Sequence, residues 1–420
     1  MAGHLTGGAP VAIVGAGYAG MAAAVALAER GVAVEVFEAG PVTGGRARAV
    51  HTRGNTYDNG QHLLVGAYRE LLGLMRRVGV AEDALLRIPL EIRYTRGFAL
   101  RELPLPGPLG LLAGLLLARG PRLGERLGAL RFLRALRAQD FRLSADCSVA
   151  ALLAGYGQDG TIGRYLWCPL CVAALNIAPE RASARAFLAV LRDTLAGPPG
   201  ASDLLLPRVD LSRLFPEPAA AYVQARGGGV HLRSPVRDLD ALRARHARVI
   251  VAVGPHQLNT LSPALAFESS YEPIVTVYLQ FSERLRLARP MLGLDGALVQ
   301  WVFDRDALCD EPGRIACVIS ARGPHLALAH DVLAARCAEE LRAALPALPP
   351  LVGAQVIAEK RATVACTPGA LRPGTRTVLD GVYRAGDYSD PEYPPTLEAA
   401  VRSGLRAAQV VLDDLAHAPA

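Results

Sequence analysis

Short apolar runs alternate with segments of helical periodicity near the start of the chain. Residues 11–14 are entirely apolar, and residues 32–37 are nearly so. Continuous apolar runs of this length are typical of parallel strands that are buried on both faces. Between them, residues 21–30 are rich in Ala, Val and Leu, and Gly31 follows, which predicts a helix and its end. The pattern therefore predicts the strand, helix and strand unit of an α/β fold.

The turn between the first strand and the helix is rich in glycine. Gly15 allows a sharp turn, Gly17 removes the side chain that would block a pyrophosphate, and Gly20 lets the helix pack close to the strand. The positive end of the helix then points at the phosphates. Glu38 follows about 20 residues later, where a carboxylate accepts hydrogen bonds from a ribose diol and repels the 2′-phosphate of NADP. The residues predicted to contact this half of an adenine dinucleotide are Gly15, Ala16, Gly17, Tyr18, Ala19, Gly20, Glu38 and Ala39.

Three further segments favour FAD over NAD. A glycine pair next to Arg46 offers another close backbone approach with an adjacent cation, which suits the long pyrophosphate of FAD. Asp387 follows an apolar run, in a motif that resembles the second flavin-contacting motif of FAD-dependent oxidoreductases. A helix expected over residues 397–412 begins after Thr396, with its positive end toward the electron-rich edge of the isoalloxazine ring. The residues predicted for these contacts are Gly45, Arg46, Val236, Gly386, Asp387, Thr396 and Leu397.

The two half-sites lie at opposite ends of the chain, so an inserted substrate domain must interrupt the cofactor domain. Two further segments, residues 230–236 and 248–253, are expected to be strands that return to the parallel sheet. We predict a Rossmann-like FAD-binding domain of the glutathione reductase type and a discontinuous α+β substrate domain. The FAD-binding domain is assigned to residues 1–88, 222–266 and 364–420, and the substrate domain to residues 89–221 and 267–363.

Charge and cysteine content limit the kinds of partner, the cellular compartment and the metal sites that we expect. The formal net charge is +6, but Lys360 is the single lysine among 45 basic residues. Such an arginine bias, with abundant Ala, Gly and Pro, indicates a GC-rich genome rather than a phosphate-binding face, so no nucleic-acid partner is expected. Seven cysteines form no even disulfide framework, which favours a reducing cytoplasm. The one CxxC, Cys168 to Cys171, has no partner pair for tetrahedral zinc, so buried thiols and no metal are expected.

Residues 103–118 are uncharged and are followed by six arginines up to Arg137. The apolar run is shorter than the roughly 20 residues that span a bilayer. The arginines alternate with leucines at spacings of three and four, as in a basic amphipathic helix. Two interpretations stay open: a helix near residues 103–142 that lies on the inner face of the cytoplasmic membrane, or an ordinary helix with its arginines in water.

The chain also contains more specific segments, at residues 58–64, 167–176, 201–212, 271–278 and 393–398. Together they are similar to the hydroxysqualene dehydroxylases, also called squalene-associated FAD-dependent desaturases, within the group of FAD-dependent amine oxidases and phytoene desaturases. The resemblance extends over residues 11–408, with Tyr18, Pro395 and Ala399 as small departures. It implies FAD-dependent reductive removal of the hydroxyl of hydroxysqualene, with an external electron donor. This would be the last step of a bacterial route to squalene, which usually feeds hopanoid synthesis.

The resemblance also suggests catalytic candidates. It places the turn containing Gly60, Gln61 and His62 near the flavin, and an imidazolium is a competent acid near neutral pH. His62 is thus the first candidate for protonating the leaving hydroxyl, so that a hydride from reduced flavin reaches an allylic cation. The alternative role of His62 is a hydrogen bond to the cofactor or a neighbouring carbonyl. Asp203 and Glu272 are the next candidates.

Two other functions stay open. An oxidative desaturase of a carotenoid or another polyene would share the fold and FAD but reverse the electron flow. A non-catalytic carrier of prenyl lipids would keep the fold without redox chemistry. A flavin amine oxidase is less favoured. Such enzymes commonly have a lysine near the flavin, but Lys360, the single lysine here, lies in a segment that itself resembles the dehydroxylases.

Overall fold

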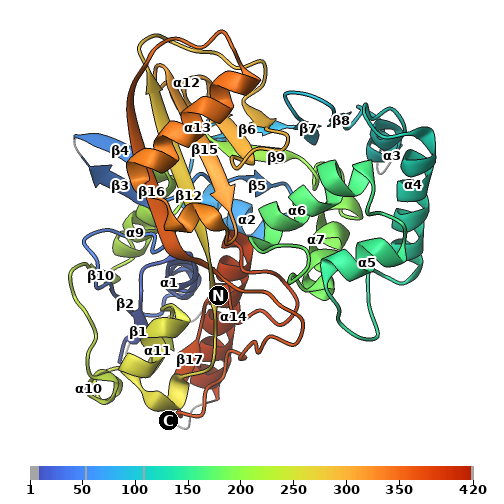
Figure 1. Ribbon diagram of the computed structural model, residues 1–420. Coiled ribbons are helices and arrows are strands. Elements are labelled where there is room, and N and C mark those ends of the chain that lie inside the picture. The colour runs from blue at the N-terminus through green and yellow to red at the C-terminus, as the bar shows by residue number, and fades with distance from the viewer. Residues whose placement is uncertain (1–8, 53, 107–108, 418–420) are drawn as a thin grey trace.

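The computed structural model describes residues 9–52, 54–106 and 109–417, and a five-stranded parallel sheet forms its lower part (Figure 1). Strand β1 lies at the centre with all four side chains buried, as its apolar run predicts. The order of the sheet confirms an α/β nucleotide-binding fold. Across the sheet the strands are β10 (Gly229–His231), β2 (Val34–Phe37), β1 (Val11–Val14), β11 (Arg248–Val251) and β17 (Val382–Arg384).

Several predicted boundaries differ from the structure. Helix α1 spans Tyr18–Glu29 and so begins earlier than residue 21, because the glycine turn itself leads into its first turn. Strand β2 begins at Val34, since the amide of Val32 still bonds to the end of α1. The strand expected over residues 230–236 ends at His231, where the chain turns at Arg233 with a positive φ of 52°.

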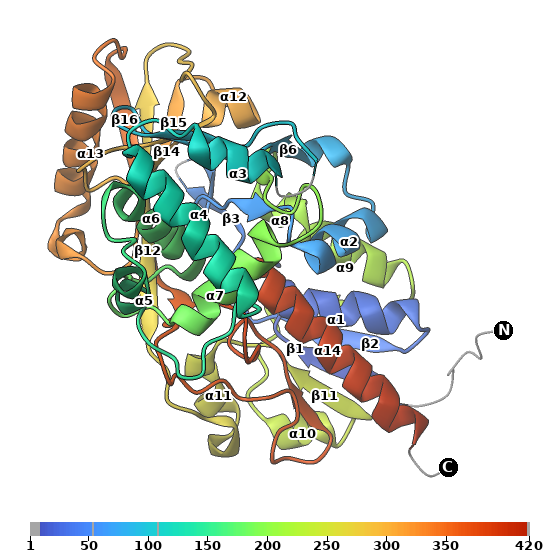
Figure 2. The same ribbon diagram turned by 90° about the vertical axis from the view of Figure 1, so that its right-hand side faces the viewer.

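Two helices from distant parts of the chain pack on α1. They are α14 (Leu397–Ala416), which extends four residues beyond its predicted end, and α9 (Pro216–Gln224). Figures 1 and 2 show α14 running beside α1. A Cβ added at Gly404 of α14 would come within 2.1 Å of the Ala19 carbonyl oxygen. This close contact fixes the C-terminal half-site against the N-terminal one.

A second, antiparallel sheet forms the upper part of the molecule (Figure 1). Helix α13 (His330–Ala344) packs against it. The long strands β12 and β16 extend from this sheet toward the nucleotide site. Its strands are, in order, β13 (Met291–Gly293), β14 (Trp301–Asp304), β15 (Arg314–Ser320), β12 (Tyr271–Phe281) and β16 (Leu351–Val364).

A group of helices lies to one side of both sheets (Figures 1 and 2). It comprises α3 (Leu109–Leu116), α4 (Leu123–Ala138), α5 (Val149–Gly155), α6 (Cys168–Leu175) and α7 (Ala184–Leu195). No helix of the described residues has both the length and the apolar character needed to cross a bilayer.

Small elements connect these parts. A three-stranded sheet, β5, β9 and β6, combines segments from both predicted domains. The domain boundary predicted after residue 221 falls inside α9, which packs on α1. The smaller elements are β3 (Ala49–Thr52), β4 (Asn55–Asp58), β5 (Leu64–Val65), β6 (Leu85–Ile88), β7 (Glu91–Arg93), β8 (Ala99–Arg101), β9 (Leu204–Pro207), α2 (Arg69–Arg77), α8 (Leu211–Leu214), α10 (Leu239–Arg243), α11 (Pro255–Leu261) and α12 (Arg305–Cys309).

Candidate functional site

The glycine turn after β1 sets up the start of α1. Gly15 has a φ of +104°, which a residue with a side chain adopts only with strain. A Cβ added at Gly20 would lie 2.0 Å from the Gly15 carbonyl oxygen, so the helix crosses the strand end in direct backbone contact. Gly17 is the N-cap and has no side chain to satisfy the first amides of α1. These amides are therefore available to an anion.

A second glycine pair faces the first turn. The amide of Gly44 donates to the Ala16 carbonyl oxygen at 2.8 Å, and Gly45 has a φ of +61°. A Cβ added at Gly45 would approach the Cα of Gly17 to 3.2 Å. The two turns thus meet without side chains between them. This bare backbone, next to a helix N-terminus, fits the pyrophosphate of a dinucleotide.

Glu38 lies at the carboxyl end of β2, beside the glycine turn. Its Oε2 accepts from the amide of Ala16 at 2.8 Å, and its Oε1 accepts from the amide of Gly40 at 2.7 Å. Ala39 continues the same turn. Val236 is partly buried and packs against the apolar cluster around β11. The Glu38 carboxylate thus lies at the carboxyl end of β2, where a ribose is expected.

Tyr18 contributes its backbone rather than its side chain. Its ring is buried and packs on Phe215, with the centroids 5.3 Å apart, and its hydroxyl donates to the Leu211 carbonyl oxygen. Burial raises the pKa of this hydroxyl above its usual value. The Ala19 side chain is also buried. Both residues can therefore reach a cofactor only through their amides.

Arg46 joins the two half-sites. Its Nη2 lies 2.6 Å from Oδ1 of Asp387, and its Nη1 donates to the Ala362 carbonyl oxygen at 2.9 Å. Asp387 follows β17 and has a largely buried side chain. The ion pair and the hydrogen bond to Ala362 therefore bring together the segment after β2, the segment after β17 and the end of β16.

The start of α14 is held by one tertiary hydrogen bond and one N-cap. The amide of Gly386 donates to Oγ of Ser403 in α14 at 2.8 Å. Thr396 is the N-cap of α14, and its hydroxyl accepts from the amide of Ala399 at 3.1 Å. Leu397 is the first residue of the helix. The positive end of a long helix is thereby fixed next to the strand that carries Asp387.

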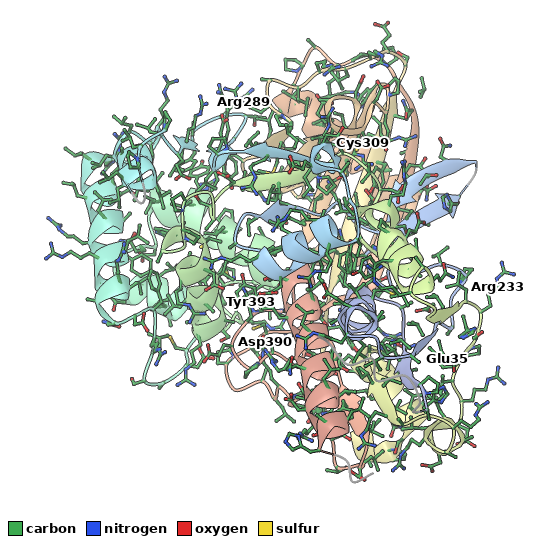
Figure 3. The ribbon with its side chains drawn as sticks, turned by 180° about the vertical axis from the view of Figure 1, so that it is seen from behind. Glu35, Arg233, Arg289, Cys309, Asp390 and Tyr393 are labelled. Carbon is green, nitrogen blue, oxygen red and sulfur yellow. The ribbon has the colours of Figure 1, made fainter. Side chains whose placement is uncertain are left out.

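The loop before α14 is also anchored by arginines. Asp390 accepts from the amide of Tyr393 at 2.8 Å and pairs with Arg406 at 3.0 Å. The guanidinium of Arg402 stacks over the Tyr393 ring at 4.4 Å. Figure 3 shows Asp390 and Tyr393 beside the upper part of α14. Among the residues that the structure describes, the buried Tyr393 hydroxyl has no hydrogen-bond partner.

The Asp58 to His62 turn is held from the second sheet. Gly60 has a φ of +107°. Oε1 of Gln61 accepts from the guanidinium of Arg305 at 3.1 Å, and the amide of Gln61 donates to the hydroxyl of Thr276 at 3.3 Å. Strand β12 and helix α12 therefore position this turn.

His62 itself contacts the turn. Its Nδ1 lies 2.9 Å from the Gly60 carbonyl oxygen, so a proton on Nδ1 donates to it. Burial, with the charge of Arg46 as a smaller cause, lowers the pKa of His62. The ring is therefore neutral near pH 7, and the observed contact is the carbonyl hydrogen bond of the alternative interpretation.

Asp58 and Arg305 form a buried ion pair that the sequence pattern did not indicate. Their side chains are 1% and 2% exposed, and Oδ2 of Asp58 lies 3.2 Å from the guanidinium. Oδ1 of Asp58 accepts from the amide of Leu211. Burial raises the pKa of Asp58 to about 6, against the opposing effect of Arg305. The pair is 247 residues apart, so no local signal could have found it.

Asp203 and Glu272 are both held by arginines. Asp203 pairs with the half-exposed Arg87 at 2.8 Å. Glu272 is buried, pairs with Arg181 at 2.8 Å and accepts from the amide of Arg322 at 3.1 Å. The two carboxylates thus lie in separate ion pairs, and the hydrogen bonds described for their side chains involve no residue of the Asp58 to His62 turn.

The cysteines are free thiols. Cys171 is buried and Cys168 is partly buried, and burial raises the pKa of both. Within residues 9–52, 54–106 and 109–417, no group of metal-binding side chains is present.

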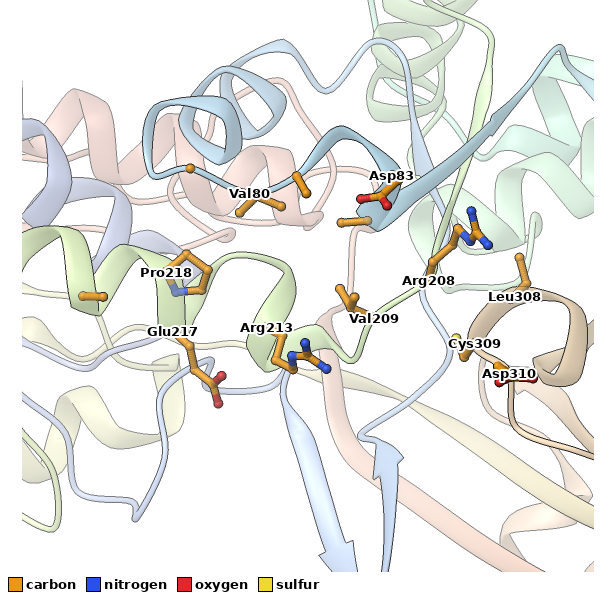
Figure 4. Close-up of a pocket in the computed structure, with 14 residues that line it drawn as sticks. Val80, Asp83, Arg208, Val209, Arg213, Glu217, Pro218, Leu308, Cys309 and Asp310 are labelled. Atoms are coloured by element: carbon orange, nitrogen blue, oxygen red, sulfur yellow. The ribbon is translucent and has the colours of Figure 1, made fainter.

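A cavity of about 770 Å³ lies away from the predicted contacts (Figure 4). It opens between the end of α2, the segment of α8 and α9, and α12. Arg208 and Arg213 line it together with Asp83 and Glu217. None of the predicted cofactor or catalytic residues lines this cavity.

Comparisons with known proteins agree with this geometry. The family described as flavin containing amine oxidoreductase matches residues 18–412. Hydroxysqualene dehydroxylase from Rhodopseudomonas palustris is 30% identical, covering 96% of this chain and 98% of that protein. A probable zeta-carotene desaturase from Synechococcus elongatus is 26% identical, with the same coverage of both chains. The crystal structure of an oxidoreductase from Methanosarcina mazei is 15% identical, with a TM-score of 0.71, over 96% of this chain and all of that one.

The structural likeness confirms the predicted fold, and the family match makes the cofactor a flavin. The chain therefore belongs to the flavin containing amine oxidoreductase family and, within it, to the family of the hydroxysqualene dehydroxylases.

Proposed function

We propose that this protein binds FAD and reductively removes the hydroxyl group of hydroxysqualene to form squalene. The likeness to the Rhodopseudomonas palustris enzyme over almost the whole chain carries the proposed activity. The ion pair between Arg46 and Asp387 supports FAD, because a cofactor long enough to need both half-sites must pass this point. The division into a discontinuous FAD domain and a substrate domain is part of the same proposal.

Each part of the cofactor has a candidate partner. The amides at the start of α1 and the bare backbone at Gly45 would hold the pyrophosphate. Glu38 would accept the ribose hydroxyls, and Asp387 would contact the ribityl chain or a phosphate. When bound and reduced by an external donor, FAD supplies a hydride.

The protein would supply orientation and a dry environment. Loss of an allylic hydroxyl is easiest when the oxygen is protonated and the resulting cation is kept from water. Aliphatic and aromatic side chains around Trp167 and Tyr278 form a large buried cluster beside the Asp58 turn. A long hydrocarbon substrate suits such surroundings, and its source would be the inner face of the cytoplasmic membrane, which the protein would contact peripherally.

Among the three candidate acids, we propose that none protonates the substrate directly. His62 is a neutral hydrogen-bond donor to the Gly60 carbonyl. Asp203 and Glu272 form ion pairs with Arg87 and Arg181. We therefore propose that His62 positions the Gly60 turn beside the flavin, and that Glu272 fixes β12 against the loop between α6 and α7 and the segment after β15.

The competing desaturase is tested by electron flow. Purified protein, reduced with dithionite under argon, is incubated with hydroxysqualene, and the extract is analysed for squalene. Parallel oxidised samples receive either hydroxysqualene or zeta-carotene. Squalene only in the reduced sample supports the proposal, and desaturated carotenoid without squalene would overturn it. A colourless protein that takes up no FAD would support the carrier.

A further inference from the structure

The surface formed by α3, α4 and the turns beside them is apolar and exposed. Twelve large hydrophobic side chains of the described residues are exposed, and six of them lie between residues 105 and 127. Figure 2 shows α3 and α4 on the outer face of the helical group. We call this the α3–α4 surface. Its exposed leucines are Leu105, Leu109, Leu116, Leu117, Leu123 and Leu127.

The packing of α3 explains why its leucines point outward. A Cβ added at Gly110 or Gly114 would come within 2.3 Å of a carbonyl oxygen in residues 101–103, so the glycine face lies directly on that backbone. Leu109 and Leu116 are seven residues apart and lie together on the remaining face. Leu117 is 66% exposed and Leu123 is 62% exposed, one on each side of the turn between the helices. The turn is thus the most exposed apolar point of the surface.

The charges of the surface are almost all positive. The segment from residue 103 to 138 contains six arginines and one acid, Glu125. Glu125 accepts from the amides of Arg122 and Thr161, so it caps α4 rather than pairing with a guanidinium. Among the described residues, the ion-paired positions nearest to this segment in the chain are Glu91 before it and Asp140 after it. The arginines are Arg119, Arg122, Arg126, Arg131, Arg134 and Arg137.

One arginine has a structural role. Arg126 donates to the carbonyl oxygens of Pro121 and Leu116, and so holds the end of α3 against the start of α4. Five guanidinium groups remain for a partner. Farther along α4, Leu130 and Leu133 pack against the buried cluster and Leu136 lies within it, so this part of the helix is an ordinary core helix. The apolar side chains of α4 that remain free are therefore those next to the turn, and the rest of its apolar face is covered by the core.

From these features we propose that the α3–α4 surface docks on an anionic lipid bilayer. The leucines at the turn would enter the acyl boundary, and the arginines would lie at the level of the lipid phosphates. A second copy of the chain is disfavoured, because it would bring the same positive charge against this surface. The proposal rests on the proposed function, since a membrane-dissolved hydrocarbon substrate requires such contact.

Flotation with vesicles tests the surface without measuring turnover. Vesicles of phosphatidylcholine with phosphatidylglycerol are compared with vesicles of phosphatidylcholine alone. The double variant Leu117→Ser and Leu123→Ser should reduce the bound fraction about tenfold. The matched control is Leu371→Ser with Val378→Ser, which are 64% and 81% exposed elsewhere and should bind as the unaltered protein does.

Charge is tested separately with Arg119→Gln and Arg122→Gln, which should weaken binding to anionic vesicles and remove much of its salt dependence. Flavin content and the circular dichroism spectrum establish that each variant is folded. Equal flotation of both leucine doubles, equal binding to both kinds of vesicle, or loss of a dimer in sedimentation of the leucine variant would overturn the proposal. Normal flotation without squalene formation would defeat the proposed function alone.

Discussion

Arg46 and Asp387 are 341 residues apart in the chain, yet Nη2 of the arginine lies 2.6 Å from Oδ1 of the aspartate. The contact forms where the chain returns through β17 and α14 to pack on α1. The predicted cofactor contacts therefore come from both ends of the chain. Flavin binding should therefore be sensitive to either member of the pair.

Asp387→Asn should weaken FAD retention by about tenfold, because the neutral amide leaves Arg46 without its charged partner. The measurement is the flavin-to-protein absorbance ratio after dialysis, followed by titration of the stripped protein with FAD. Asp380→Asn, a change at an exposed carboxylate just before β17, is the control and should retain the cofactor. Equal retention by the two variants would remove the ion pair from the site.

Gly20→Ala should destabilise the protein by about 1–3 kcal/mol, because the new methyl group would overlap the Gly15 carbonyl oxygen. Gly73→Ala is the matched control. Gly73 lies in α2 with nothing within 4 Å of an added Cβ. The Gly73→Ala variant should therefore be more stable than the unaltered protein by about 0.5–1 kcal/mol. Urea unfolding of both variants measures the difference. A tolerated Gly20→Ala would show that α1 does not need this close contact.

His62→Gln separates positioning from acid catalysis. If His62 positions the turn, the variant should retain turnover within about tenfold, whereas loss of a general acid costs about a hundredfold or more. The pH profile of kcat should also keep its shape, because the buried imidazole of the unaltered protein is neutral near pH 7. A hundredfold loss together with a missing acidic limb would make His62 the acid.

Arg305→Met should cost about 3–5 kcal/mol, because it leaves the buried carboxylate of Asp58 without a counter-charge. Arg142→Met removes an arginine that is 77% exposed and should change the free energy of unfolding by less than about 1 kcal/mol. Chemical denaturation compares the two. Similar values would mean that the Asp58 turn does not depend on this ion pair.

Acid should weaken the attachment of α14. Hydrogen bonds from Arg376 and Tyr383 lower the pKa of Asp414 to about 2. A carboxylate with a lowered pKa in the folded state contributes stability above its unfolded pKa of about 3.9, and that contribution is lost as the pH falls toward 2. Because Arg376 is largely exposed, the effect should be below about 1 kcal/mol. Asp414→Asn should flatten this part of the stability curve, and an unchanged curve would contradict the assignment.

Local sequence signals predicted the first half-site because its parts are close in the chain. The run from Val11 through the glycine turn to Glu38 forms one strand, helix and strand unit, so periodicity and glycine spacing locate it. The start of α14 is likewise a local signal, because Pro394, Pro395 and Thr396 are typical of a helix N-terminus and the helix begins at Leu397.

The rest of the site depends on contacts between distant segments. No pattern around Arg305 indicates that it is buried against Asp58, and a carboxylate such as Glu272 looks available until Arg181 is placed beside it. The roles of these polar residues depend on their tertiary neighbours, which the sequence alone does not reveal. Exposure likewise decides what the arginine spacing of α4 left open: the leucines at the start of α4 are exposed, whereas those farther along it pack on the core.

The most direct test of the proposed activity is a single turnover. Protein with a known content of reduced flavin is mixed anaerobically with excess hydroxysqualene, and the return of oxidised-flavin absorbance is followed while squalene is quantified. We predict one squalene formed for each flavin oxidised, with no oxygen required. Flavin that stays reduced while hydroxysqualene is recovered unchanged would contradict the account.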